Sequence, residues 1–100
     1  MSFKIADLFP VRKGDLVKLR EETNERHRKD YGRWEWDHNG DGAGERFVEG
    51  DDHSLYGKML LVLNDPHKQD MFRGKVVDVF VQEDEKYDIV HVEDLQRMIL

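Results

Sequence analysis

The fold is decided by the stretch Val76-Val-Asp-Val-Phe-Val81, Gln82-Glu-Asp-Glu-Lys86 and Tyr87-Asp-Ile-Val-His-Val92. Valine and aromatic residues favour strands, and successive side chains of a strand point to opposite faces of a sheet. The first segment is therefore predicted to be a strand whose valines 77, 79 and 81 share one face. The last segment is predicted to be a second strand, and the acidic segment between them a polar turn.

Two further apolar stretches lie N-terminal to this pair. Leu16, Val17 and Leu19 follow the turn-forming Gly14-Asp15, and Lys58-Met-Leu-Leu-Val-Leu63 ends at Asn64-Asp65-Pro66. Both stretches are interpreted as strands bounded by turns. At the other end, residues 93–98 place Leu95 and Met98 at the spacing of one helical turn. The sequence thus predicts a mainly β protein of about five strands with a C-terminal helical turn. We expect a small barrel, because closure removes exposed strand edges.

Composition narrows the class of protein. A chain of 100 residues has the size of one domain, so residues 1–100 are treated as a single domain. The net charge of −6 lacks the basic footprint of a nucleic-acid binder, although five Lys and Arg residues among the first twenty form a local basic strip. There is no cysteine and hence no disulfide. We expect no membrane span and no secretion through a signal peptide.

The segment 20–56 interrupts the strand pattern and is predicted to be a long loop insertion. Its first part, residues 20–30, contains no apolar anchor, which favours a solvated loop or helical turn over a charged contact surface. Its second part, residues 31–54, holds five of the eight glycines and both tryptophans. Loops of this length are usually functional or mobile.

Trp34 and Trp36 are candidate partner-binding residues, together with the neighbouring Arg33. In an extended segment, alternation places both indoles on one face, where exposed tryptophan would form a binding anchor. The alternative is that both side chains fold back and cap the barrel core. The scarcity of large apolar residues in this chain favours the capping interpretation.

An acidic, glycine-rich segment in the same insertion resembles the start of a calcium loop. Asp37, Asn39 and Asp41 occupy loop positions 1, 3 and 5, Gly42 occupies position 6, and Glu45 occupies position 9. At position 12, where a bidentate glutamate is expected, the chain has Val48, and Glu49 lies one place late. The candidate Ca²⁺ ligands are therefore Asp37, Asn39, Asp41, Glu45 and Glu49. An acidic loop rich in turns and without metal is the favoured alternative.

No catalytic motif stands out, and we expect no enzymatic activity. The hydroxyl nucleophiles are Ser2, Ser54 and Thr23, and the adjacent His53-Ser54 pair does not make a triad. The five histidines lie far apart and show no metal-ligand spacing. The glycines lie among acids, which would repel phosphate.

The strand segments resemble the SH3-like barrels, and most of all the small SH3-like proteins of tailed bacteriophages. The resemblance rests on four stretches, which are Lys13–Val17, Gly57–Leu63, Val76–Val81 and Tyr87–Leu95. It implies a non-enzymatic binding or structural module that places segment 20–56 in the first long loop, where ligand contacts often lie. The implied partner is another protein, a host or virion component, and the implied location is the virion or the host cytoplasm. Two alternative functions remain open, a nucleic-acid-associated regulatory barrel and a calcium-binding interaction domain using residues 37–49. The chain could also form an oligomer.

Overall fold

The computed structural model describes residues 11–36 and 44–98, and this part of the chain is mainly β with a single α-helix. It divides into two compact units. Described residues 11–20 and 55–98 form the first, which we call the sheet unit. Described residues 21–36 and 44–54 form the second, which we call the ribbon unit, and it lies within the segment predicted to be a long loop.

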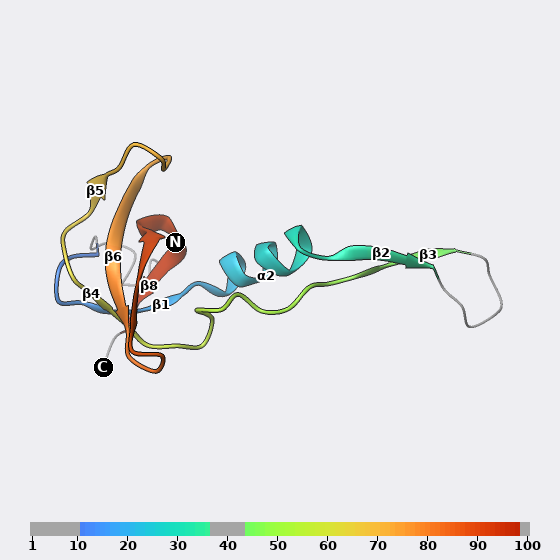
Figure 1. Cartoon of the computed structure of the whole chain (residues 1–100), viewed down its shortest axis with the longest axis horizontal. Helices are drawn as coiled ribbons and strands as arrows, with labels where there is room; N and C mark the ends of the chain where they lie inside the picture. Colours follow the sequence, from blue (N-terminus) through green and yellow to red (C-terminus); the bar gives the residue numbers. More distant parts are fainter. Residues whose placement is uncertain (1–10, 37–43, 99–100) are drawn as a thin grey trace, which may run out of the picture. The chain divides into compact units, whose positions relative to one another are not determined.

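The sheet unit contains one antiparallel sheet, in which the longest strand is β6 (Figure 1). Its strands are β1 (Leu16–Leu19), β4 (Leu60–Val62), β5 (His67–Lys68), β6 (Lys75–Val81), β7 (Lys86–His91) and β8 (Leu95–Arg97). Strand β6 pairs with β4, β5 and β7, while β1 pairs with β4 and β8. Within the described residues the sheet has six strands rather than about five and is not closed, so the mainly β class is confirmed but the barrel is not.

Strand β6 places its valines as its sequence predicts. Val77, Val79 and Val81 are fully buried, whereas Asp78 and Phe80, which alternate with them, are only partly buried. On the neighbouring strand, Val90 is the buried residue and lies opposite Val77. The buried apolar side chains form one core cluster: Val11, Val17, Leu55, Leu60, Val62, Val77, Val79, Val81, Val90 and Leu95. The core therefore draws on both ends of the described chain.

The turn before β1 forms where Gly14-Asp15 predicts it. Gly14 has a φ of +91°, a conformation that glycine adopts without a steric penalty. The backbone N–H of Arg12 donates to the Asp15 carboxylate at 2.8 Å, and the Gly14 N–H donates to the carbonyl of Val62 at 2.8 Å. This turn thereby joins the start of β1 to β4.

The predicted helical turn at residues 93–98 is wrong in its position. A 3₁₀ turn, η1, spans Val92–Asp94, and the chain then extends into β8. Leu95 is buried and lies opposite Leu19 of β1, and the Met98 N–H donates to the Leu16 carbonyl at 2.9 Å. The backbone N–H and C=O groups of Leu95–Arg97 can pair with β1 only if this segment is extended. The hydrogen bonds of this pairing outweigh the helical spacing of Leu95 and Met98.

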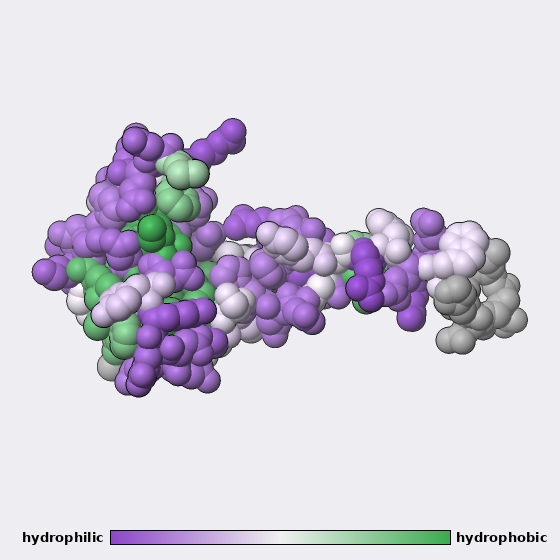
Figure 2. Space-filling view, in the orientation of Figure 1, coloured by the Kyte–Doolittle hydropathy of each residue, from purple (hydrophilic) through white to green (hydrophobic). Residues whose placement is uncertain are grey.

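The ribbon unit has regular structure rather than the long irregular loop that its sequence suggests. Helix α2 (Glu21–Asp30) leads into β2 (Arg33–Trp36), which pairs antiparallel with β3 (Glu45–Val48) (Figure 1). The helix carries acidic residues in its first turn and basic residues in its last turn, which complements the helix dipole. Apolar residues gather over the sheet unit, whereas the surface along α2 is mostly hydrophilic (Figure 2).

Candidate functional site

The β2–β3 ribbon presents aromatic side chains on one of its two faces. Trp34 lies opposite Phe47 and Trp36 opposite Glu45, and cross-strand partners share a face. We call these four residues the aromatic face. The Trp34 and Phe47 rings meet edge to face with centroids 5.4 Å apart. The two tryptophans remain 67% and 56% exposed, so they do not cap a core as the favoured interpretation of the sequence expects.

The opposite face of the ribbon is charged. Arg33 lies opposite Val48, and Glu35 opposite Arg46. The Arg33 Nε lies 2.6 Å from a Glu35 carboxylate oxygen, an ion pair between neighbours on one strand. Strand alternation thus brings Trp34 and Trp36 together as expected, but it separates Arg33 from them.

A buried asparagine joins helix α2 to the chain that returns from the ribbon. Asn24 is 2% exposed, and its side-chain amide donates to Asp52 at 2.9 Å. Its side-chain oxygen accepts a hydrogen bond from the backbone N–H of His53 at 2.7 Å. Arg28 adds ion pairs with Glu49 and Asp52 at 3.7 and 3.8 Å. These polar contacts hold a ten-residue helix that would be marginal in isolation.

Two glycines allow close packing where the helix meets the ribbon. A Cβ on Gly32 would lie 2.3 Å from the Phe47 ring and 2.7 Å from the Val48 carbonyl oxygen. A Cβ on Gly50 would lie 2.7 Å from the Tyr31 carbonyl oxygen. The Gly50 N–H also donates to the Arg28 carbonyl at 2.8 Å. Any larger residue at either position would push the ribbon away from the end of the helix.

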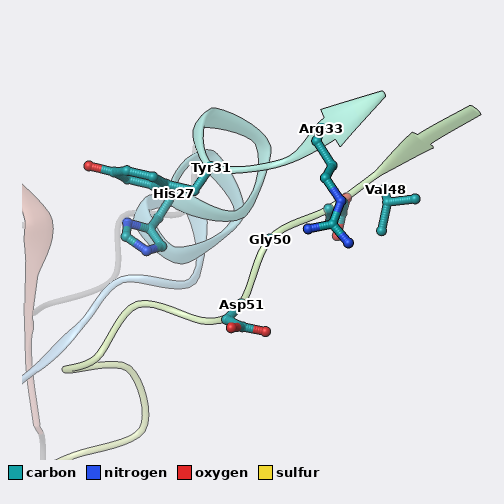
Figure 3. Close-up of a pocket in the computed structure, with 7 residues that line it drawn as sticks. His27, Tyr31, Arg33, Val48, Gly50 and Asp51 are labelled. Atoms are coloured by element: carbon teal, nitrogen blue, oxygen red, sulfur yellow. The ribbon is translucent and has the colours of Figure 1, made fainter. Parts of the chain in front are cut away.

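A pocket of about 470 Å³ lies in the ribbon unit, and its lining includes Arg33 and Val48 of the charged face (Figure 3). Its lining residues come from the end of α2 and from both arms of the ribbon: His27, Tyr31, Arg33, Val48, Glu49, Gly50 and Asp51. The His27 ring lies 4.5 Å from that of Tyr31 and 4.7 Å from that of His53, measured between centroids. The fold therefore brings together two histidines that are far apart in sequence. Their proximity was not predicted.

Of the five candidate calcium ligands, only Glu45 and Glu49 lie within the described residues. Asp37, Asn39 and Asp41 lie outside the described residues, so the calcium prediction stays a prediction. Glu45 lies on the aromatic face beside Trp36, and Glu49 is engaged with Arg28. Within residues 11–36 and 44–98, no group of three or more His, Asp or Glu side chains is arranged to hold a metal ion.

A second surface lies on the outer face of the sheet unit. Leu63, Asp78, Tyr87, Asp88 and Ile89 line a groove of about 480 Å³. Tyr87 packs against Phe80, with ring centroids 5.3 Å apart, and remains 73% exposed. The lining of this groove contains one aromatic residue, Tyr87, whereas the aromatic face of the ribbon contains three.

Sequence reasoning missed Phe47 as a member of the aromatic face and considered Glu45 only as a candidate Ca²⁺ ligand, an assignment that stays a prediction. The antiparallel register of β2 and β3 identifies both, because it places Phe47 opposite Trp34 and Glu45 opposite Trp36. In the sequence, the signal is that these two segments flank a stretch rich in glycine and acidic residues, a composition typical of turns. The run Glu45–Val48 is too short and too mixed in composition to be recognised as a strand by itself.

No helix in the described part of the chain is long and apolar enough to cross a membrane.

Comparison with known protein families, with characterised proteins and with solved structures finds no match to this chain. The candidate site therefore rests on its own geometry, which is an exposed aromatic face on a two-stranded ribbon.

Proposed function

We propose that this chain is a non-enzymatic protein-interaction module that binds its partner through the aromatic face of the β2–β3 ribbon. The observation that carries the proposal is the exposure of Trp34 and Trp36, at 67% and 56%, on one face. Tryptophan is enriched among the residues that dominate binding energy at protein interfaces. An exposed pair, backed by Phe47, is the kind of apolar patch that marks an interaction surface.

The architecture of the sheet unit supports a scaffold role in this proposal. We propose an SH3-like arrangement, supported by the pairing of β1 with both β4 and β8 and by the 3₁₀ turn directly before β8. In such a fold the ribbon unit occupies the first long connection, between β1 and β4. The resemblance of the strand motifs to small tailed-phage proteins supports a virion or host protein as the partner.

The test is a pull-down from the native source with three forms of the full chain. These are the wild type, Trp34→Ala/Trp36→Ala, and the matched control Tyr87→Ala/Ile89→Ala, which removes exposed apolar side chains from the sheet unit. We expect one stoichiometric partner with the wild type and the control, and its loss with the tryptophan variant. Circular dichroism of each variant checks that the fold is kept. Equal recovery of that partner with all three forms would refute the proposal.

A further inference from the structure

The net charge of the chain resides entirely in residues 21–54, the segment of the sequence that contains the ribbon unit. Residues 21–54 contain five Lys and Arg against eleven Asp and Glu, a net charge of −6. This equals the net charge of all 100 residues, so the remainder sums to zero. The exposed tryptophans thus lie in the acidic part of the protein, within a segment whose field attracts cations.

The two faces of the ribbon carry different charged residues. Arg33 and Arg46 lie on the charged face, where Glu35 is paired with Arg33 and lies opposite Arg46. The described residues of the aromatic face include one charged side chain, the exposed Glu45, which lies directly opposite Trp36. The face therefore combines aromatic rings with a carboxylate and holds no cation of its own among its described residues.

This combination is chemically suited to a cation. The face of an indole ring attracts Arg or Lys through its quadrupole, and a neighbouring carboxylate accepts charge-assisted hydrogen bonds from the same group. The rings of Trp34 and Phe47 meet edge to face and are not stacked, so the two rings do not cover each other face to face. A guanidinium also stacks on aromatic rings and pairs with a carboxylate in two hydrogen bonds, which an ammonium cannot reproduce.

Charge also excludes other occupants of this face. A second copy bound through the same face would bring two segments of net charge −6 together, and like charges across an interface are unfavourable. Nucleic-acid phosphates and anionic lipid headgroups would be repelled for the same reason. We propose that the aromatic face binds an arginine-bearing, cationic segment of its protein partner. This inference rests on the proposed function and adds the chemistry of the partner.

The experiment titrates the full chain with a capped Gly-Arg-Gly-Arg-Gly peptide and with its citrulline analogue, which has nearly the same shape without the charge. Both tryptophans of the chain lie on the aromatic face, so intrinsic tryptophan fluorescence reports on this surface alone. We expect the arginine peptide to change the emission saturably and the citrulline peptide to bind at least about fivefold more weakly. We also expect the affinity to fall as salt is raised from low ionic strength.

Two variants locate the binding. Glu45→Gln should weaken arginine-peptide binding about three- to fivefold, whereas the control Glu25→Gln, which removes the same charge from an exposed position of α2, should leave it within twofold. Equal binding of arginine and citrulline peptides, or equal effects of the two variants, would overturn the inference. No binding of either peptide would overturn it as well. The proposed function fails separately, when the double tryptophan variant still captures the partner.

Discussion

Trp34 and Phe47 face each other across the β2–β3 ribbon, with ring centroids 5.4 Å apart and ring planes inclined at 63°. Edge-to-face aromatic pairs contribute about 0.5–1.5 kcal/mol beyond the area that they bury. A two-stranded ribbon is marginal in water, so this pair matters to its order as well as to its surface. The residues that stabilise the ribbon and those that would bind a partner are therefore partly the same.

Gly32→Ala should disorder the ribbon. The added Cβ would lie 2.3 Å from the Phe47 ring and 2.7 Å from the Val48 carbonyl oxygen, and relieving such overpacking costs about 1–3 kcal/mol. We expect faster amide hydrogen exchange in β2 and β3 and the loss of ring-current shifts at Trp34. Gly32→Ala/Phe47→Ala should recover only part of the protection, because the contact with the Val48 carbonyl remains and the Trp34–Phe47 ring pair is lost. Unchanged exchange in the single variant would contradict the packing described.

Asn24→Ala should loosen the ribbon unit. The substitution removes the hydrogen bonds to Asp52 and from the His53 N–H, and the loss of such buried hydrogen bonds costs about 1–3 kcal/mol. We expect faster exchange of the His53 amide and of α2. The control is Glu25→Ala, the adjacent exposed helix residue, which should change exchange little. Similar exchange in both variants would show that the asparagine does not hold the helix.

Asp84→Asn should reduce the dependence of stability on acid pH. The hydrogen bond from the Lys58 ammonium, assisted by the charges of Lys58 and Lys86, lowers the pKa of Asp84 below its ordinary value. A lowered pKa in the folded state stabilises the fold above the unfolded pKa, and this stabilisation is lost as the pH falls through the folded pKa. Urea unfolding at several pH values should therefore show a steeper loss below about pH 4 for the wild type than for the variant. Parallel profiles would refute this assignment.

Val79→Ala should destabilise the sheet unit by about 2 kcal/mol. Val79 lies in β6, is fully buried and belongs to the core cluster, so its truncation removes apolar contacts and leaves a cavity. Chemical denaturation measures the loss. Val48→Ala, at a half-buried ribbon position, serves as the comparison and should cost less. An equal cost at both positions would show that β6 is not the centre of the core.

The sequence predicted the sheet unit well where one local pattern was sufficient. The alternation of valines in β6, the turn at Gly14-Asp15 and the strand at Leu16–Leu19 are all present. The candidate calcium ligands Asp37, Asn39 and Asp41 lie outside the described residues, so the calcium site stays a prediction. Leu95 shows where local pattern failed, since its helical spacing was outweighed by pairing with Leu19.

The helix and the strand pairing of the ribbon unit depend on tertiary contacts. Helix α2 has no apolar stripe to identify it, and its stability comes from the buried Asn24 and from Arg28, whose partners lie more than twenty residues away. The aromatic face likewise depends on the register that places Phe47 opposite Trp34 and Glu45 opposite Trp36. Sequence by itself determined which residues alternate and where the negative charge is concentrated, because both follow from order along the chain. Only the tertiary structure decided which of them meet, because register and long-range hydrogen bonds join residues that no local pattern connects.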